Sequence, residues 1–474
     1  MLFVLLMFGF AVWGWVDVRK RGKVDPQDIY AHRTDFTVYT EAGAAFFDGR
    51  DPYEVGNPRG WKYLYPPLFA MLVAPLHALP PQTAVMIWFA LSALMWWGCY
   101  AECVRIARAC WPDAPDRGLF GPIPPAIGWL AVLAAVLPAF NCLQRGQVEV
   151  AKLFLLMLGF RLVIERRSPW LTFLGGAAFA LTIVLKVTPL LPVAMVLGQQ
   201  LLNGWHERWT RSARTHVGAL WLGTGLGMAV FIFVLPSALV GWQANLKHLD
   251  TWWNKVAMRM ETTTADSFAG NSYSVRNQSL TNATHRLGNW IHYQFGSGPF
   301  DDGPMNLGKG GPGLVMDKPV VDHLLLAGRI LTGCLLLIVA LRTARDDLGG
   351  QAAAFGLAYV ATLVTVPIAR GHYFVAMLPG ILFLGAWLVR QGRGRWAIVL
   401  AMAPWTLIIP HYIFVDAVGR MGLLGLGTAA WYTAGCVTML AFRRVAREEA
   451  VEDEVDPPRI LVLPQPSVGR AAAA

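Results

Sequence analysis

Residues 217–240 read VGALWLGTGLGMAVFIFVLPSALV and contain no charged side chain. About 20 consecutive apolar residues are enough to cross the hydrocarbon core of a bilayer as an α-helix. Arg208, Arg211 and Arg214 come just before this stretch, and a long polar segment follows it from residue 241. The stretch therefore predicts a transmembrane helix whose first end faces the cytoplasm, where lysine and arginine are enriched.

Further apolar runs occur at 1–16, 83–104, 125–141, 148–164, 171–185, 188–202, 323–341, 351–369, 372–389, 396–411 and 421–441. Because several are shorter than about 20 residues, we expect some of them to be tilted or merged with a neighbour. The run 68–79 contains Pro75 and follows Pro66 and Pro67, which predicts a short helix packed inside the protein rather than a span. The pattern as a whole predicts an all-α polytopic integral membrane protein with about ten to twelve transmembrane helices.

The composition excludes a soluble protein with several domains. Of the 474 residues, 55% are hydrophobic and only 15% are charged, whereas charged residues make up about 25% of ordinary soluble domains. The net charge of +10 comes from basic residues scattered between the apolar runs. A nucleic-acid-binding protein concentrates such residues on one face or tail, so we expect no nucleic acid as a partner. The six cysteines show no CxxC spacing and are interpreted as small core residues.

Small groups of basic residues follow alternate membrane exits. They are Arg105 with Arg108, Arg161 with Arg166 and Arg167, Arg208 with Arg211 and Arg214, Arg342 with Arg345, Arg390 with Arg393 and Arg395, and Arg443 with Arg444 and Arg447. The positive-inside rule makes this side the cytoplasmic face of the inner (plasma) membrane. The basic residues Arg19, Lys20, Arg21 and Lys23 oppose this orientation for the first run alone.

This topology divides the chain into a membrane domain and a tail. We expect a transmembrane domain over residues 1–447, with outer loops at about 17–67 and 241–322. The tail 448–474 starts with an acidic run and ends rich in proline, which predicts a disordered cytoplasmic segment. The first run lacks a basic start and a small-residue cleavage site, so it predicts a retained helix rather than a cleaved signal peptide.

Isolated polar residues gather on the outer side of this topology. They occur in DFTVY (35–39), GRDPY (49–53), YLYPPLFAMLVAPL (63–76), RGQVEV (145–150), KVTPLL (186–191) and RGHYF (370–374). An unpaired ionisable group costs several kcal/mol near the hydrocarbon, so these residues are functional candidates.

The ordered set of these motifs, from about residue 30 to residue 400, resembles glycosyltransferase family 87. The resemblance is carried by an early Asp before G-x-DPY, by Y-x-YPPLFA-x-L-x-APL, by a GQ turn that opens an apolar helix, by K-x-x-PLL and by a late HY. That family comprises polytopic enzymes similar to the polyprenol-phosphate-mannose-dependent mannosyltransferases of the GT-C class. The chain departs from the family pattern at Glu149, where Asn is usual, and at Ala369 and Arg370, where Ser and Trp are usual.

The resemblance implies a GT-C-type fold and transfer of a hexose from a polyprenyl-phosphate donor to a glycolipid or cell-envelope glycan, with mannose as the expected hexose. The attacking hydroxyl needs a carboxylate base opposite the leaving phosphate. The resemblance assigns this role to Asp35, with Asp51 as the alternative, and direct displacement would invert the anomeric configuration.

Cations must receive the negative charge that develops on the leaving phosphate. The candidates for binding the donor phosphate are Lys186, Arg145, His372 and Arg370. The candidates for binding the remaining parts of the substrates are Tyr39, Asp51, Tyr53, Tyr63, Tyr65, Gln147, Asn271, Asn277 and Gln278.

Each candidate also has a structural alternative, and the sequence leaves these alternatives open. Asp35 could pair with Arg33 or cap a helix. Lys186 could extend to the interface as an ordinary lysine, and Arg370 could meet lipid headgroups. The tyrosines could belong to the aromatic belt of a membrane protein.

Motifs for nucleotide hydrolysis, dinucleotide binding and zinc proteolysis do not occur, and the outer Asp and His residues are too dispersed to indicate a metal. We therefore expect no cofactor. Nucleotide sugars are cytosolic, so a site on the outer side favours a polyprenyl-phosphate sugar that enters from the bilayer. The alternatives are an arabinosyl or other lipid-linked sugar transferase, a lipid-linked saccharide transporter or flippase, and a non-catalytic scaffold. A transporter would carry charged residues reachable from both sides at the midplane, which the one-sided clustering disfavours.

Overall fold

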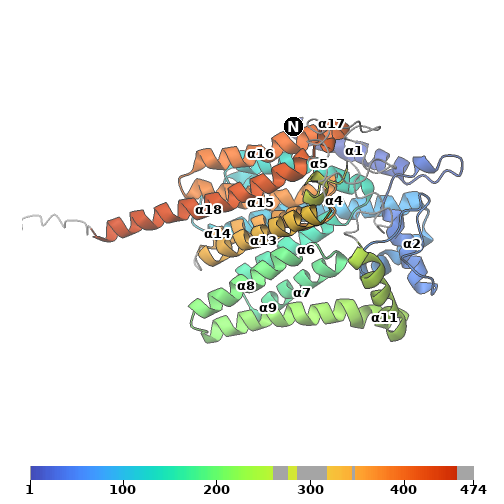
Figure 1. Cartoon of the computed structure of the whole chain (residues 1–474), viewed down its shortest axis with the longest axis horizontal. Helices are drawn as coiled ribbons and strands as arrows, with labels where there is room; N and C mark the ends of the chain where they lie inside the picture. Colours follow the sequence, from blue (N-terminus) through green and yellow to red (C-terminus); the bar gives the residue numbers. More distant parts are fainter. Residues whose placement is uncertain (1, 260–275, 285–317, 344–346, 456–474) are drawn as a thin grey trace, which may run out of the picture.

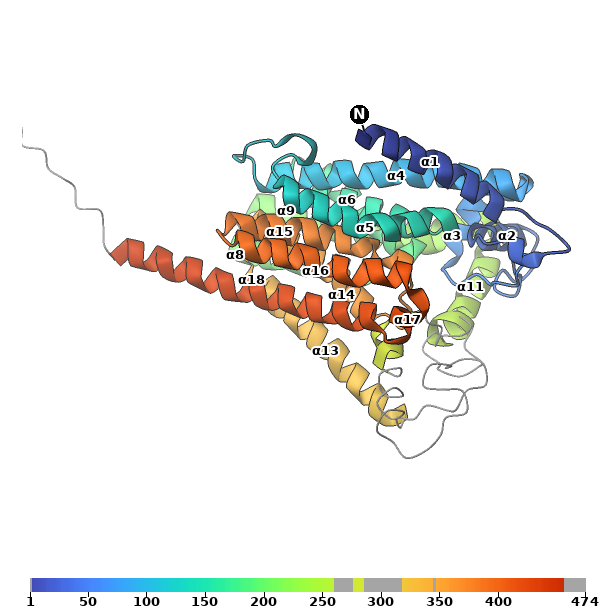
Figure 2. The same cartoon turned by 90° about the horizontal axis from the view of Figure 1, so that it is seen from above.

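The computed structural model describes residues 2–259, 276–284, 318–343 and 347–455, and these residues form helices joined by short connections. The long helices run side by side along one axis (Figures 1 and 2). They are α1 (Leu2–Arg21), α4 (Pro81–Cys110), α5 (Pro125–Arg145), α6 (Glu149–Ile164), α7 (Pro169–Leu185), α8 (Leu190–His206), α9 (Arg211–Ala229), α13 (Lys318–Arg342), α14 (Leu348–Thr365), α15 (Met377–Arg390), α16 (Gly394–Ile413) and α18 (Leu423–Val455). Most of the apolar runs predicted from the sequence coincide with one of these helices, but the run 217–240 continues from α9 through a π-helical turn (Val230–Val234) to Val240, the run 351–369 extends beyond the end of α14 at Thr365, and the run 372–389 begins in a 3-10 turn before α15.

Eight helical stretches of the described chain are long and apolar enough to cross a bilayer, so the chain is a polytopic membrane protein. They are Pro81–Cys110, Pro125–Arg145, Arg211–Val240, His323–Arg342, Leu348–Thr365, Gly371–Arg390, Gly394–Ile413 and Leu423–Phe442. Helices α6, α7 and α8 lie alongside them but have only 16 or 17 residues each. The count of ten to twelve spans stays a prediction. Helix α1 continues to Arg21, beyond the predicted end at residue 16.

Helices α14 and α15 form the centre of the bundle, where 89% of each spanning stretch is buried. Glycine allows their close approach, because a Cβ at Gly356 would lie 2.7 Å from the carbonyl oxygen of Pro379. Phe160 of α6 stacks on Phe355 of α14 with ring centroids 4.1 Å apart. Lipid tails are as apolar as leucine, so close packing of this kind, rather than hydrophobic burial, holds membrane helices together.

One end of the bundle carries the short helices and the longest connections (Figure 1). They are α2 (Phe36–Phe47), α3 (Pro67–Val73) with the turn η2 (Ala74–Ala78), α10 (Leu235–Val240), α11 (Trp242–Thr251), the π-helical turn η5 (Trp252–Val256), η7 (Gly371–Ala376) and α17 (Val415–Arg420). Helix α3 begins at Pro67, and its side chains Leu68 and Phe69 are buried inside the protein. The run 68–79 therefore forms a short internal helix, as its prolines predicted.

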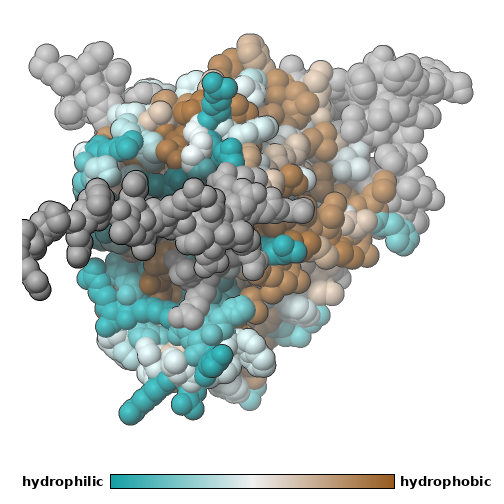
Figure 3. All heavy atoms as spheres, turned by 90° about the vertical axis from the view of Figure 1, so that its left-hand side faces the viewer, coloured by the Kyte–Doolittle hydropathy of each residue, from teal (hydrophilic) through white to brown (hydrophobic). Residues whose placement is uncertain are grey.

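The opposite end of the bundle carries the basic groups. Helices α4, α6, α8, α13 and α15 all end there, and Figure 3 shows hydrophilic side chains gathered on this end with hydrophobic side chains along the flank behind them. Glu102 of α4 is buried at this end and accepts hydrogen bonds from Arg105 and Arg161. The structure thus separates the basic end from the end that carries the short helices. That the basic end faces the cytoplasm stays a prediction. Residues 448–455, which the sequence placed in a disordered tail, continue helix α18, and the disorder predicted for 456–474 concerns residues outside the described ones.

Candidate functional site

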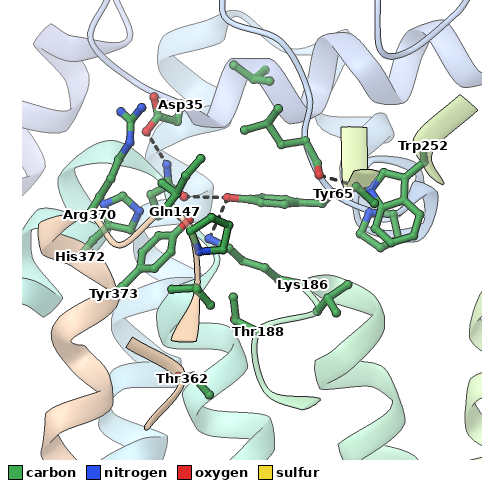
Figure 4. Close-up of a pocket in the computed structure, with 18 of the residues that line it drawn as sticks. Asp35, Tyr65, Gln147, Lys186, Thr188, Trp252, Thr362, Arg370, His372 and Tyr373 are labelled. Atoms are coloured by element: carbon green, nitrogen blue, oxygen red, sulfur yellow. Dashed lines mark hydrogen bonds between the residues drawn. The ribbon is translucent and has the colours of Figure 1, made fainter. Parts of the chain in front are cut away.

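A cavity of about 1350 Å³ opens at the end of the bundle that carries the short helices. Its walls come from the start of α2, the loop before α3, the α5–α6 and α7–α8 turns, the turn η5 and the segment before and within η7 (Figure 4). Eight residues singled out from the sequence line it together, although they are spread over more than 300 residues of chain: Asp35, Tyr39, Tyr65, Arg145, Gln147, Lys186, Arg370 and His372.

Asp35 stands at the N-cap of α2, but its side chain makes no capping hydrogen bond. Its carboxylate instead accepts from Arg145, with Nε to Oδ2 at 2.8 Å and Nη2 to Oδ1 at 3.0 Å, and from the side-chain amide of Gln147. The backbone N–H of Asp35 also donates to the carbonyl of Arg145 at 2.8 Å. The partner of Asp35 is therefore Arg145, 110 residues away in the chain, and not the neighbouring Arg33.

The turn Arg145–Gln147 depends on the glycine between these two residues. Gly146 caps α5 with φ of 69°, a left-handed conformation that glycine adopts without strain. A Cβ at this position would lie 2.6 Å from the Cβ of Phe36 in α2. Glycine thus lets the α5–α6 turn pack directly against the start of α2, and this contact brings Arg145 and Gln147 to Asp35.

The electrostatics of the pair keep Asp35 ionised at neutral pH. Burial alone would raise the pKa of the Asp35 carboxyl, but the charge of Arg145 and its hydrogen bonds outweigh burial and hold the pKa below the usual value of 3.8. A carboxylate offers about four lone-pair positions. Arg145 and Gln147 occupy three of them, so one position on Oδ1 remains for a substrate hydroxyl.

A second group of buried charges lies at the first turn of α6. Glu149 pairs with both Lys152 and Lys186, and the side chains of all three are at most 6% exposed. Lys152 also donates to the hydroxyl of Thr188 at 2.6 Å. Lys186, which directly follows α7, lies 3.8 Å from the ring centroid of Tyr373. The carboxylate of Glu149 thus holds Lys186 at the cavity wall.

Hydroxyl groups connect the two charged groups. Tyr39 and Tyr65 both donate to Oε1 of Gln147, at 3.0 and 3.2 Å. Lys186 donates to the hydroxyl of Tyr65 at 3.1 Å. A continuous path of hydrogen bonds therefore runs from Asp35 through Gln147 and Tyr65 to Lys186 (Figure 4).

Arg370 and His372 enter the cavity from the segment around η7. Within the described residues, the guanidinium of Arg370 has no hydrogen-bond acceptor or carboxylate partner, although Figure 4 shows it extending toward Asp35. His372 is 2% exposed, and neither of its ring nitrogens bonds to a described residue. These two side chains are therefore available to a ligand in the cavity.

The other residues predicted from the sequence, as far as the structure describes them, do not line the cavity. Tyr53 and Tyr63 are fully buried and donate to the backbone carbonyls of Tyr65 and Pro66. Asp51 caps the backbone N–H of Tyr53 and pairs with Lys255 at 3.4 Å. These side chains shape the loop before α3, and the structure gives Tyr53 and Tyr63 no access to a sugar in the cavity.

Asn277 and Gln278 support the cavity from behind. The side-chain oxygen of Asn277 accepts from the backbone N–H of Ala369 at 3.0 Å, and the backbone N–H of Gln278 donates to the carbonyl of Ala369 at 2.6 Å. Both side chains are buried. The side chain of Asn277 and the backbone of Gln278 hold the segment that leads into Arg370, whereas the side-chain amide of Gln278 donates to the carbonyl of Gly419 at 2.9 Å. Asn271 lies outside the described residues.

Sequence reasoning missed Glu149 and Lys152 as members of the site, and also the cavity-lining aromatic residues Trp61, Trp252 and Tyr373. A signal for the first two was present: they stand three residues apart in an otherwise apolar helix, where buried charges require partners. The aromatic residues gave no signal, because the chain contains twenty tryptophans and twelve tyrosines.

The described residues contain no group of three or more His, Cys, Asp and Glu side chains arranged to hold a metal ion.

Comparison with known proteins gave two matches. Residues 63–305 match the family model described as glycosyltransferase family 87. The chain is 26% identical to the polyprenol-phosphate-mannose-dependent alpha-(1-2)-phosphatidylinositol mannoside mannosyltransferase of Mycolicibacterium smegmatis, over 97% of this chain and 93% of that protein. No solved structure matches the chain.

Proposed function

The chain belongs to glycosyltransferase family 87. We propose that it transfers a hexose, with mannose as the expected sugar, from a polyprenyl-phosphate donor to a hydroxyl of a glycolipid or cell-envelope glycan. The reaction takes place at the outer face of the membrane in the cavity described above. The relative from Mycolicibacterium smegmatis, which depends on polyprenol-phosphate-mannose, supports this donor.

The observation that carries the proposal is the charge of the cavity. Arg145, Lys186 and Arg370 line the cavity together with Asp35, and the buried residues Glu149 and Lys152 lie directly behind Lys186. Lys62 also lines the cavity, but it is paired with Glu54 at 3.0 Å, so these groups count four cations against two carboxylates. The site therefore holds an excess of two positive charges. A sugar phosphodiester carries one negative charge, and the phosphate monoester that leaves carries close to two. The site thus matches the charge of the departing polyprenyl phosphate better than that of the donor, as transition-state stabilisation requires.

The chemical step is a direct displacement with Asp35 as general base. The acceptor oxygen forms a bond to the anomeric carbon while the bond from that carbon to the phosphate oxygen breaks. The acceptor proton passes to Oδ1 of Asp35, and the electron pair of the broken bond stays on the phosphate. Although Arg145 makes Asp35 a weak base, the hydroxyl becomes strongly acidic as its oxygen bonds to carbon, so a late proton transfer is sufficient.

The position of the cavity favours an enzyme over a transporter. The residues that line it come from helix ends and turns at one end of the bundle. A transporter needs a substrate site near the midplane that alternates between both sides.

The test is transfer of radiolabelled mannose from synthetic polyprenyl-phosphate mannose into native lipid extract by the purified protein in nanodiscs. Asp35→Asn should lower kcat by about 10²- to 10⁴-fold, the usual contribution of a general base, while donor binding is retained. Asp51→Asn is the matched control, because Asp51 pairs with Lys255 outside the cavity, and it should transfer at the wild-type rate.

Full transfer by Asp35→Asn would refute the assignment of the base. If the wild-type protein transferred arabinose but not mannose from the same lipid phosphate, the proposed reaction would stand and the proposed sugar would be wrong.

A further inference from the structure

A second cavity, of about 790 Å³, lies at the basic end of the bundle, where α4 and α6 end. Four arginines and one carboxylate line it: Arg105, Arg108, Arg161, Arg167 and Glu165. Its other lining residues are Ala109, Ile164 and Leu348. None of these residues lines the candidate active site, which opens at the opposite end of the bundle. We call this separate cavity the arginine pocket.

Carboxylates hold the arginines of the pocket in place. Glu102 of α4 is 2% exposed and accepts from Arg105 of the same helix at 2.7 Å and from Arg161 of α6. Glu165, which directly follows α6, accepts from Arg161 at 3.0 Å and lies 3.1 Å from Nε of Arg167. These contacts join the end of α4 to the end of α6, so the guanidinium groups are positioned before any ligand arrives.

The arginines at the rim keep most of their hydrogen-bond donors, of which each guanidinium has five. Among the described residues, Arg105 donates through one terminal nitrogen to Glu102, and Arg108 donates through one terminal nitrogen to Asp116 at 2.8 Å. Neither terminal nitrogen of Arg167 has an acceptor in the same part of the chain. The three side chains are 56%, 56% and 70% exposed, so their free donors are within reach of an anion. Phosphate oxygens suit such donors because they accept parallel N–H bonds from a guanidinium.

The charge of the pocket also suits a phosphodiester. The four lining arginines face Glu165 and the partner carboxylates Glu102 and Asp116, which leaves one positive charge over. The next carboxylate, Asp347, accepts from the backbone N–H of Gly350 and the indole of Trp387, and it makes no ion pair with a described residue. A phosphodiester carries a single negative charge and therefore matches the excess.

Exposed tryptophans show that the pocket lies at the depth of the lipid headgroups. Trp170 in the first turn of α7, Trp205 in the last turn of α8 and Trp396 in the first turn of α16 are 63%, 72% and 51% exposed. All three belong to the basic end, and tryptophan is enriched at membrane–water interfaces. Arg167 precedes Trp170 by three residues, and Arg108 lies in the last turn of the spanning helix α4. The hydrophilic end and the hydrophobic flank in Figure 3 meet at this level.

We propose that the arginine pocket binds the phosphate of an anionic glycerophospholipid in the leaflet at the basic end of the bundle. Basic pockets between membrane helices are the usual sites for anionic headgroups. The apolar side chains Ala109, Ile164 and Leu348 offer contacts to the glycerol and the first methylenes of the acyl chains, whereas no lining residue is aromatic and could stack on a nucleobase. A bound lipid would bridge the ends of α4 and α6 and would stabilise the protein, whatever sugar the opposite end transfers.

The experiment measures binding of dioleoylphosphatidylglycerol to the purified full-length protein in detergent by native mass spectrometry. Wild-type protein should bind this lipid at least about tenfold more tightly than dioleoylphosphatidylcholine, which has the same phosphodiester but no net charge. The double variant Arg108→Gln/Arg167→Gln should weaken binding of the anionic lipid by about tenfold to thirtyfold, because each arginine near an anionic lipid contributes about fivefold. Both side chains lie at the rim, and neither holds the buried Glu102.

Two further variants make the test specific. Arg211→Gln/Arg214→Gln removes the same charge from exposed positions of α9 outside the pocket and should change binding less than threefold. Arg108→Lys/Arg167→Lys keeps the charge but loses the guanidinium forks, so it should bind the anionic lipid about threefold to tenfold more weakly than the wild type. Thermal melting without added lipid checks that each variant is folded. If the glutamine variant of the pocket melts early, the lysine variant decides the test.

Equal weakening by the two glutamine variants would overturn the proposal, because it would indicate attraction to the basic surface as a whole. Equal binding of the two lipids by the wild type would also overturn it, as would wild-type affinity of the lysine variant. Displacement of phosphatidylglycerol by inorganic phosphate at millimolar concentration would replace the lipid with a soluble anion and refute the lipid assignment.

Discussion

Arg145 and Arg370 both line the cavity, but the structure predicts that only the loss of Arg145 lowers the stability of the protein. Arg145 makes two hydrogen bonds to Asp35, at 2.8 and 3.0 Å, and the two side chains are only 16% and 11% exposed. Arg370 has neither an acceptor nor a carboxylate partner among the described residues. Arg145→Gln therefore leaves a buried carboxylate without its ion pair. Arg370→Gln removes a cation that makes no hydrogen bond to a described residue and whose attraction to Asp35 is opposed by burial and by repulsion from Arg145.

The magnitude follows from these contacts. Removing one partner of a fully buried ion pair costs about 3–5 kcal/mol. The pair faces a cavity and Gln147 still donates to Asp35, so we expect about 2–3 kcal/mol for Arg145→Gln. Unfolding entropy is about 2.1 cal/mol/K per residue, or roughly 1 kcal/mol/K for 474 residues. Arg145→Gln should therefore lower the midpoint of thermal unfolding by about 2–3 °C, while Arg370→Gln should leave this midpoint unchanged.

Activity should separate the two roles further. Arg370→Gln loses a charge-assisted contact with the departing phosphate, worth about 1.5–3 kcal/mol, which lowers kcat roughly tenfold to a hundredfold. Arg370→Lys keeps the charge and should recover part of that loss. The assays are tryptophan-fluorescence melting in detergent and transfer of radiolabelled sugar. If Arg370→Gln melts as early as Arg145→Gln, or if Arg145→Gln melts like the wild type, the assignment of Asp35 to Arg145 is wrong.

Two further predictions concern pH and helix packing. Arg145 lowers the pKa of Asp35, so the stability that the ionised carboxylate contributes is fully present above about pH 3.8 and is lost only as the pH falls through the lower pKa of the folded state. In Arg145→Gln the effect of burial on this pKa dominates, so the acid limb of kcat/KM should move to higher pH than in the wild type. A pH–rate profile checks this shift, and an unmoved acid limb would contradict it. At Gly223 a Cβ would lie 2.1 Å from the carbonyl oxygen of Phe173, so Gly223→Ala should force α7 and α9 apart and destabilise the protein by about 1–3 kcal/mol. Gly225→Ala is the control, because a Cβ there meets open space, and this variant should melt at the wild-type temperature. Equal melting temperatures of the two variants would contradict this packing.

The sequence predicted the helical architecture well because bilayer crossing depends on local composition. A run such as 217–240 requires a helix wherever it lies in the fold, since every backbone polar group in hydrocarbon must be bonded within its own segment. The helices observed from α4 to α18 follow the apolar runs closely. The prolines before Leu68 likewise predicted the short helix α3, because their effect on the backbone is local.

Predictions about the site were more uneven. Isolated polar residues at membrane exits indicated eight of the side chains that line the cavity, because a charge near hydrocarbon is rare in any context. The same reasoning did not separate Tyr65, which reaches Lys186, from Tyr53 and Tyr63, which are buried against backbone carbonyls. All three belong to motifs of the same kind, and the direction of each side chain depends on how the loop before α3 folds over α2.

The sequence by itself thus determined that this chain is a bundle of membrane helices with polar residues gathered at one end, because hydropathy and charge act through neighbouring residues along the chain. Only the tertiary structure decided which charges pair. Asp35 takes Arg145 rather than Arg33, and Glu149 takes Lys186 from another part of the chain in addition to Lys152, its neighbour in the same helix. Partners that lie 37 to 110 residues apart meet only when helices pack, so the excess of positive charge that defines the site is a property of the packed bundle.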